Sequence, residues 1–168
     1  QTQMQDTFGM NMVALIDGQP RLLNLREMLD AFLRHRREVV TRRTVFDLRK
    51  ARERGHILEG LAVALANVDE IVELIKSSET PAIAKERLLG RAWKSAMVEE
   101  MLARIDSEYS RPVNIGPEFG LHADGYHLSE IQAQRILEMQ LQRLTNLESD
   151  KIIGEYKEIM EKIADLLD

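Results

Sequence analysis

The sequence predicts a mainly α protein: a long antiparallel two-helix coiled coil with a small helical globule at its tip, plus a short N-terminal β-hairpin. Two stretches with an unbroken helical pattern predict this fold, residues 24–67 and residues 147–168. The region between them, residues 68–146, carries signals for several short helices. At a rise of about 1.5 Å per residue the first stretch forms a rod roughly 65 Å long, which needs a second helix to cover its apolar side.

Residues 1–23 are expected to be the end of an upstream region and to hold the hairpin. Residues 10–23 indicate two short strands about Asp17-Gly18, a dipeptide that favours tight hairpin turns. One hairpin is only marginally stable alone, so we expect it to lean on neighbours outside this sequence. The absence of an initiator methionine and the apolar pattern still running at Asp168 likewise predict a piece of a larger protein.

The first long helix, residues 24–67, is predicted to begin with a capping box. Asn24 can cap the free N–H groups of the first turn, and Glu27 can reach back to the backbone of Asn24. We expect the helix to end near Asn67 as its C-cap, with Asp69 as the N-cap of the next helix. The apolar residues recur at the three-and-four spacing of one helix face: Leu25, Leu29, Phe32, Leu33, Val39, Val40, Leu48, Ala51, Leu58, Ala62 and Leu65.

The tip globule, residues 68–146, is predicted to contain four short helices. A capping hydroxyl followed by proline marks one start at Thr80-Pro81, and the capping box of Ser129 with Gln132 marks another. Two prolines and three glycines break the periodicity of residues 106–128, so this segment is predicted to be a loop. The expected helices cover about 69–75, 80–89, 93–105 and 129–144.

The return helix, residues 147–168, is expected to open at a third capping box, Thr145 with Glu148. Its apolar residues follow a heptad spacing: Ile152, Tyr156, Ile159, Ile163 and Leu166. The same steps occur on the long helix at Thr44, Leu48, Ala51, Gly55, Leu58, Ala62 and Leu65. The two helices are therefore predicted to pair antiparallel, the return helix covering the long helix back to the early forties.

Composition excludes several classes of function. The chain has no cysteine, so it has neither disulfides nor a thiolate metal site, which fits a reducing cytoplasm. No apolar run approaches the ~18 residues that span a bilayer, so no membrane partner is expected. His122 and His127 lie five apart in a predicted loop, a poor basis for a metal site. No nucleophile elbow or phosphate-binding loop is present, so we predict no catalytic residue and no metal.

A basic block interrupts this acidic chain. Residues 34–54 carry nine Arg or Lys against three acidic residues, a net charge of +6 in a chain with an overall charge of −5. Arginines at heptad spacing form rows beside the apolar stripe, and phosphate contact would give them salt-dependent affinity for DNA. Pairing with acids elsewhere, or plain solvation, is the alternative. The predicted DNA-binding residues are Arg34, Arg36, Arg37, Arg42 and Arg43.

The helix predicted at 129–144 is apolar around more than half of its surface. It is either a buried core helix or the contact between two copies of the chain. Self-association is favoured, because a small tip cannot cover so much apolar surface alone. The predicted dimer-interface residues are Ile136, Leu137, Met139, Gln140, Leu141 and Leu144.

Several runs of this sequence resemble the A subunit of bacterial DNA gyrase, a type IIA topoisomerase. They are FGMNMVALIDGQPRLLNLREMLDAFLRHRREVVTRRT, ARERGHILEGLAVALAN, PEFG, QAQRILEMQLQRL and EYKE, in this order. The resemblance covers nearly the whole chain and is weakest at 79–114. The A subunit of topoisomerase IV is the nearest relative of that family, but RHRREVVTRRT followed by ARERGHILEGLAVALAN looks more like gyrase.

The resemblance implies the C-terminal part of the breakage–reunion region, namely the coiled coil and the exit gate at which two copies meet. It implies ATP-dependent supercoiling by double-strand passage in the full enzyme, whose partners are double-stranded DNA and the gyrase B subunit. The family cleaves DNA with a tyrosine that directly follows an arginine. The tyrosines here follow Glu108, Gly125 and Glu155, so no cleavage by this stretch alone is expected.

The family's Mg²⁺ and ATP sites belong to the partner subunit, so no cofactor is expected in this stretch. One alternative stays open beside the corresponding region of topoisomerase IV. It is a helical module that forms dimers without binding DNA.

Overall fold

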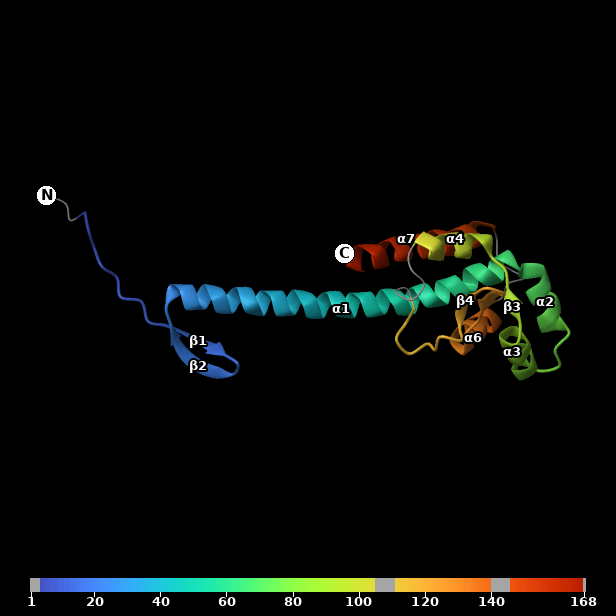
Figure 1. Ribbon diagram of the computed structural model, residues 1–168, viewed down its shortest axis with the longest axis horizontal. Coiled ribbons are helices and arrows are strands. Elements are labelled where there is room, and N and C mark those ends of the chain that lie inside the picture. The colour runs from blue at the N-terminus through green and yellow to red at the C-terminus, as the bar shows by residue number, and fades with distance from the viewer. Residues whose placement is uncertain (1–3, 105–110, 140–145, 168) are drawn as a thin grey trace. The chain divides into compact units, whose positions relative to one another are not determined.

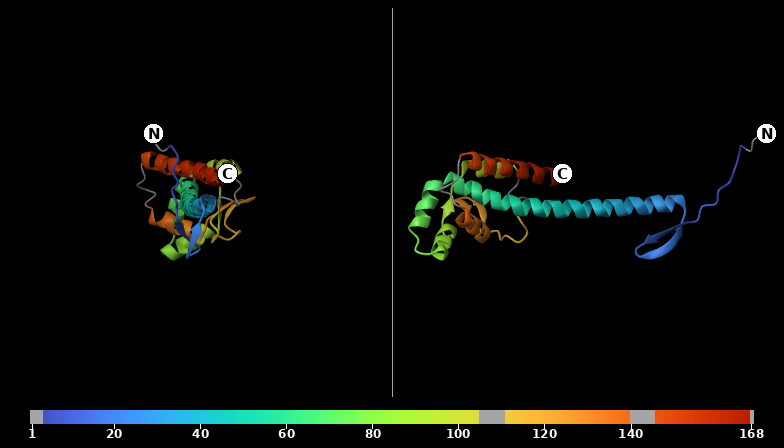
Figure 2. Two further views of the ribbon diagram at one scale, coloured as in Figure 1. Left: turned by 90° about the vertical axis from the view of Figure 1, so that its left-hand side faces the viewer. Right: turned by 180° about the vertical axis from the view of Figure 1, so that it is seen from behind.

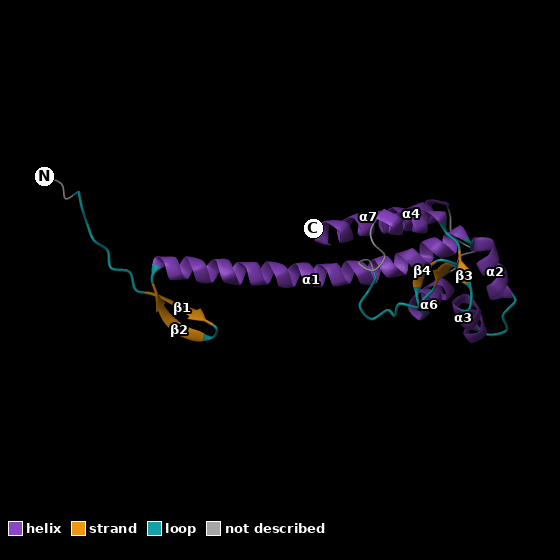
Figure 3. Ribbon diagram, viewed as in Figure 1, coloured by secondary structure: helices purple, strands orange, loops and turns teal. Residues whose placement is uncertain are grey.

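The computed structural model describes residues 4–104, 111–139 and 146–167 (Figure 1). The chain divides into two compact units, Gln1–Val45 and Phe46–Asp168, and the helix α1 contributes residues to both. Helices dominate, as predicted, and the strands of the described residues lie in a hairpin and in one small sheet (Figure 3). The elements are β1 (Met12–Ile16), β2 (Gln19–Leu23), α1 (Leu25–Ala66), α2 (Val68–Lys76), α3 (Pro81–Leu89), β3 (Ala92–Trp93), α4 (Ala96–Arg104), β4 (Gly120–His122), β5 (Gly125–His127), α6 (Glu130–Glu138) and α7 (Asn146–Leu167).

The predicted hairpin is confirmed in the first unit. Strands β1 and β2 pair antiparallel, with Val13 opposite Leu22 and Ile16 opposite Gln19. Asp17 and Gly18 both have positive φ, 53° and 78°, as a two-residue turn of the favoured hairpin type requires.

The predicted start of α1 is confirmed as well. The backbone N–H of Glu27 donates to Asn24 Oδ1, and the N–H of Asn24 donates to Glu27 Oε2, both at 2.9 Å. These reciprocal bonds satisfy N–H groups that the first helical turn leaves without a partner. The expected long helix of residues 24–67 is observed as α1, residues 25–66.

Within the second unit, α7 lies beside residues 46–66 of α1 and runs in the opposite direction (Figures 1 and 2). Gly55 makes room for this contact, because a Cβ atom there would lie 3.1 Å from Ile159 Cγ2 and 3.4 Å from Ile163 Cδ1. An exposed ion pair joins Arg54 to Glu155 at 2.6 Å. Ile159 and Ile163, two of the residues predicted for this contact, thus face the second half of α1.

The opposite side of this half of α1 is covered by the small sheet with α3 and α6 (Figures 1 and 2). The strand order is β3-β5-β4, and both pairings are antiparallel. The core of the unit joins both sides and includes the fully buried Leu58, Ile71, Leu88, Trp93, Val98, Tyr126, Leu128, Ile136, Tyr156 and Ile163. None of the described helices is long and apolar enough to cross a bilayer.

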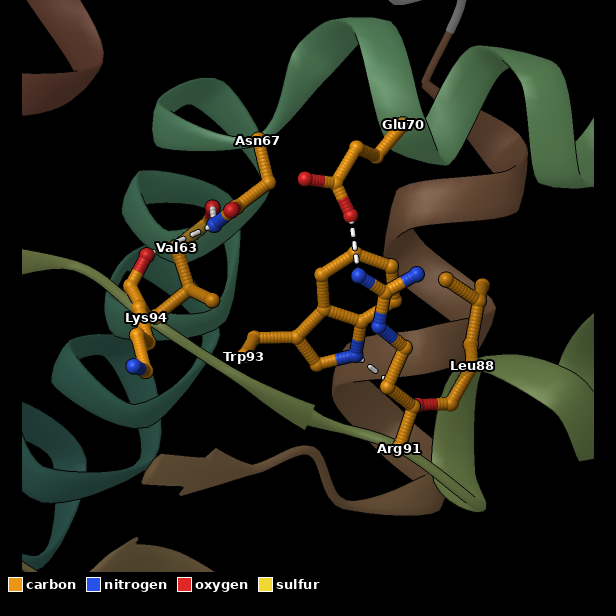
Figure 4. A network of polar contacts seen from close by, with 7 residues as sticks. All are labelled: Val63, Asn67, Glu70, Leu88, Arg91, Trp93 and Lys94. Atoms are coloured by element: carbon orange, nitrogen blue, oxygen red, sulfur yellow. Dashed lines mark hydrogen bonds and ion pairs between the residues drawn. The ribbon is translucent and has the colours of Figure 1, made fainter. Parts of the chain in front are cut away.

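The junction of α1 and α2 differs from the prediction in its cap. Asp69 is not the N-cap: α2 begins at Val68, and Asn67 occupies the N-cap position without a side-chain cap bond. The Asn67 amide instead donates to the backbone oxygens of Val63 and Lys94, each at 2.8 Å (Figure 4). The predicted end of α1 at Asn67 is confirmed, since α1 ends at Ala66. The Asn67 side chain binds one of the last four carbonyl groups of α1 and also joins the junction to the chain after β3.

The predicted helix 93–105 and the predicted loop 106–128 are both wrong in part. The helix, α4, starts at Ala96, because Trp93 pairs with Tyr126 in the sheet and donates its Nε1–H to the oxygen of Leu88 at 3.0 Å. Arg91 stacks on the Trp93 ring, 4.8 Å from its centre, and pairs with Glu70 of α2 (Figure 4). The loop segment contains β4 and β5, which are too short to show a period in sequence.

The capping box at Ser129 is confirmed, but α6 ends earlier than predicted. Helix α6 stops at Glu138, and Met139 is extended with φ −80° and ψ 124°. Neither proline nor glycine marks this end, so the sequence offers no stop signal there. The third predicted capping box cannot be compared, because Thr145 lies outside the described residues.

Candidate functional site

The predicted DNA-binding arginines all lie exposed on the first part of α1. Arg42 pairs with Glu38 one turn earlier, and Arg43 also has an interaction partner. Among the described residues, no ion pair involves Arg34, Arg36 or Arg37. These three therefore present charged groups that a phosphate backbone can contact.

An exposed apolar surface accompanies these arginines on the same part of α1. Phe32 is 61% exposed and Leu33 52%, and Val39 and Val40 are also exposed. Apolar side chains at this spacing on one helix usually face a partner. In the second half of the helix, by contrast, the apolar residues Leu58 and Ala62 are buried.

A buried cluster of polar side chains, which the sequence did not predict, lies in the second unit. It joins α1, β5, α6 and α7 and consists of His56, Glu59, Tyr126, Ser129, Gln132 and Tyr156. One signal was available: Glu59 follows Gly55 by four residues and precedes Ala62 by three, which places a carboxyl on the buried face. We call these six residues the polar cluster.

Gln132 is the centre of the polar cluster. Its Oε1 accepts from the backbone N–H of Ser129 at 2.9 Å, and its Nε2 donates to the backbone oxygen of His56 at 2.6 Å. A backbone N–H can only donate and a backbone oxygen can only accept, so these two bonds determine the orientation of the Gln132 amide. The same Nε2 lies 2.8 Å from the hydroxyl of Tyr126, which therefore accepts from it.

Glu59 lies within hydrogen-bond distance of the hydroxyl groups of two tyrosines. Since Tyr126 accepts from Gln132, its own O–H is directed to Glu59 Oε1. The hydroxyl of Tyr156 lies 3.5 Å from Glu59 Oε2, a long contact. The chain of donors thus runs from the start of α6 through β5 to α1.

Burial dominates the electrostatics of the polar cluster. Desolvation raises the pKa of Glu59 to about 7, against the opposing effect of the tyrosine hydroxyls and the charge of Arg111. Desolvation, helped by the same arginine, lowers the pKa of His56 to about 4. Burial and the neighbouring Glu59 also raise the pKa of Tyr126 and of Tyr156. In mildly acidic solution, between the lowered pKa of His56 and the raised pKa of Glu59, the cluster therefore has little net charge.

The predicted dimer-interface residues divide into three groups. Ile136 has no exposed surface and packs in the core of the single chain. Leu137 and Met139 are half-buried and lie against the edge of that core. The other three residues, Gln140, Leu141 and Leu144, lie outside the described residues.

The two histidines of the β4–β5 turn contact each other without forming a metal site. The rings of His122 and His127 meet edge to face with centres 5.0 Å apart. His127 Nε2 lies 3.0 Å from a carboxyl oxygen of Asp124, and this hydrogen bond lowers the pKa of Asp124. Within the part of the chain that the structure describes, no three His, Asp or Glu side chains converge as metal ligands would.

Comparison with known proteins gives one consistent family. A family model that describes the A subunit of DNA gyrase/topoisomerase IV matches residues 1–168. The chain is 60% identical to the DNA gyrase A subunit of Pseudomonas aeruginosa over 167 residues, which cover 99% of this chain and 18% of that protein. It is 58% identical to the Neisseria gonorrhoeae protein of the same name over 169 residues, with the same coverage of 99% and 18%.

The DNA gyrase A subunit of Escherichia coli is 55% identical over 156 residues, which cover 93% of this chain and 18% of that protein. The chain thus spans 18% of the length of these curated relatives. A match of the family model over every residue, together with these identities, leaves one assignment. The chain belongs to the family of DNA gyrase and topoisomerase IV A subunits.

Proposed function

We propose that this chain is the part of a gyrase A subunit that forms a coiled coil and the dimerising exit gate. In the whole enzyme this part would serve ATP-dependent DNA supercoiling by double-strand passage. One observation carries the proposal: a chain of this family packs its last helix, α7, along the second half of α1 and holds a small folded domain beside them. Gyrase is favoured over topoisomerase IV because the relatives named above are gyrase subunits.

The coiled coil of the proposal uses the two heptad patterns. The contacts of Gly55 with Ile159 and Ile163 support it, because a small residue opposite two branched ones lets the helices approach. The exposed Arg54–Glu155 pair flanks this contact as charged residues flank coiled-coil seams. In this proposal, residues 24–67 and 147–168 are the two helices and residues 68–146 are the gate domain.

The gate is proposed to close by contact between two copies of the gate domain. Leu137 and Met139 support this, since each is half-buried at the end of α6 and leads into Gln140, Leu141 and Leu144. An apolar contact at the tips could hold the two halves of the enzyme together while DNA is cut, and still part transiently.

The basic segment of α1 is proposed to contact double-stranded DNA. The exposed Arg34, Arg36 and Arg37 support this role, with Arg42 and Arg43 beside them. The proposal assigns DNA cleavage to a region upstream of this chain, and it assigns Mg²⁺ and ATP to the gyrase B subunit. The same assignment implies a cytoplasmic location.

The experiment that tests the proposal is sedimentation equilibrium of the 168-residue chain at tens of micromolar. We expect a dimer, and we expect Leu137→Asp to give a monomer with an unchanged circular dichroism spectrum. Ile131→Asp is the matched control, because Ile131 is 45% exposed on the same helix and lies outside the predicted interface.

A monomeric chain at these concentrations would contradict the gate. A dimer that shows no salt-dependent binding to plasmid DNA would favour the alternative, a dimerising helical module without a nucleic-acid partner.

A further inference from the structure

His56 and Glu59 lie one helical turn apart on α1, and both are buried, 6% and 7% exposed. The groups that face them come from every neighbouring element. Helix α7 contributes Tyr156, β5 contributes Tyr126, and α6 contributes Gln132, which does not titrate. The remaining charge is Arg111, which acts through space from the segment before β4.

The hydrogen bonds require His56 to be neutral. The Nε2 of Gln132 faces His56 Nδ1 at 3.3 Å, and the amide cannot turn round because backbone groups fix its orientation. Both hydrogens of this amide nitrogen are taken by the backbone oxygen of His56 and the hydroxyl of Tyr126. An amide nitrogen does not accept hydrogen bonds, so a hydrogen on Nδ1 would have no partner there, and the ring carries its hydrogen on Nε2. That hydrogen is directed to Ser129 Oγ at 2.7 Å. An imidazolium would direct its Nδ1–H at the Gln132 amide nitrogen, which cannot accept it.

The surroundings of Glu59 favour the protonated acid. Among the described residues, no lysine or arginine forms an ion pair with its carboxyl group. Oε1 accepts from Tyr126, whereas the nearest partner of Oε2 is the Tyr156 hydroxyl at 3.5 Å. A buried carboxylate without a cation is costly, and a protonated Oε2 can instead donate to the oxygen of Tyr156.

We infer that folding moves one proton from His56 to Glu59, so that the polar cluster closes without net uptake or release of protons in mildly acidic solution. In the unfolded chain the imidazole is charged and the carboxyl ionised. In the folded chain both are neutral, so the proton count and the net charge balance. The inference concerns the folding of the second unit and does not depend on the proposed gate.

The two pKa shifts predict how the stability of the chain depends on pH. The pKa of Glu59 rises from 4.5 to about 7 on folding, so its stabilisation is complete below pH 4.5 and is lost as the pH rises through 7. The pKa of His56 falls from 6.5 to about 4, so its stabilisation is present above pH 6.5 and is lost as the pH falls through 4. Between pH 4.5 and 6.5 the two trends oppose and cancel.

The test measures the unfolding equilibrium constant in urea between pH 5 and pH 8. From these pKa values the opposing titrations of His56 and Glu59 together change the unfolding constant of the unmodified chain only about twofold. In His56→Gln only Glu59 of the pair still titrates, and the unfolding constant then rises roughly 70-fold from pH 5 to pH 8. In Glu59→Gln only His56 of the pair still titrates, and the unfolding constant falls roughly 30-fold over the same range. Changes are compared with the unmodified chain, which removes the common contribution of other groups.

His122→Gln and Glu158→Gln are the matched controls, because both residues are exposed and lie outside the polar cluster. They are expected to keep the slope of the unmodified chain. Single variants of His56 and Glu59 that also keep this slope would overturn the inference.

A measurement on the unmodified chain covers the case of a variant that does not fold. At pH 5.5, nitrogen and carboxyl-carbon NMR should show a neutral His56 ring with hydrogen on Nε2 and a protonated Glu59. A charged His56 or an ionised Glu59 at that pH would overturn the inference.

Discussion

The backbone of Gly60 on α1 lies directly against the side chain of Gln132 on α6. A Cβ atom at Gly60 would be 2.6 Å from Cγ and 2.7 Å from Cβ of Gln132, closer than atoms can approach. Gln132 cannot move aside without losing its bonds to Ser129, His56 and Tyr126. The missing side chain at residue 60 is therefore what lets the polar cluster form against α1.

Gly60→Ala is expected to destabilise the chain. Overpacking at a buried contact costs about 1–3 kcal/mol, and the better helix propensity of alanine offsets at most about 1 kcal/mol. Urea unfolding measures the difference. Gly154→Ala on α7 is the control, because a Cβ atom there meets nothing within 4 Å. The control should gain up to about 1 kcal/mol, and equal effects at both glycines would contradict the contact.

Tyr126→Phe is expected to cost about 1–3 kcal/mol of unfolding free energy, because it removes the hydrogen-bond donor to Glu59 Oε1 and one of the hydrogen bonds of Gln132 Nε2. Tyr156→Phe should cost less, since that hydroxyl makes only one long contact, 3.5 Å from Glu59. Both substitutions keep the aromatic ring, so packing is unchanged. Urea unfolding at pH 6 compares the two variants. A larger loss of unfolding free energy for Tyr156→Phe than for Tyr126→Phe would contradict the hydrogen bonds assigned to the two tyrosines.

Asn67→Ala is expected to loosen the junction of α1 and α2. It removes the two hydrogen bonds to the oxygens of Val63 and Lys94, which contribute about 1 kcal/mol each. Hydrogen exchange should therefore speed up at residues 67–70 as the unfolding midpoint falls. Asn114→Ala, at an exposed position before β4, serves as the control and should leave both measurements unchanged.

Replacing Arg34, Arg36 and Arg37 together by Gln is expected to weaken binding to double-stranded DNA and to flatten its salt dependence. Each lost phosphate contact lowers the slope of log K against log salt by about 0.9. The control removes three positive charges from exposed positions on α7, Lys151, Lys157 and Lys162. Equal slopes for the two triple variants would show that net charge, and not this part of α1, determines the affinity.

Local signals in the sequence predicted much of the fold. The Asp17-Gly18 turn and the caps at Asn24, Thr80 and Ser129 all depend on residues a few positions apart, and each occurs as expected. The long period of α1 was visible for a similar reason, because it repeats over 42 residues. Such local patterns do not depend on contacts with distant parts of the chain.

The errors arose where distant contacts decide the local structure. Trp93 was assigned to a helix, but its pairing with Tyr126 places it in the sheet. Asp69 is predicted to be the N-cap of α2, but Asn67 occupies that position and its amide also bonds to the backbone oxygen of Lys94. The polar cluster belongs to the same class, because nothing near Glu59 in the sequence indicates that two tyrosines from β5 and α7 meet it.

The difference in exposure along α1 bears on proteolysis. Trypsin cuts after arginine only where the backbone can open locally, and a helix without tertiary cover opens most easily. Arg34, Arg36 and Arg37 lie on the exposed part, whereas Arg52 is half-buried in the second unit. Brief digestion of the chain should therefore sever α1 among the first three arginines well before it cuts after Arg52.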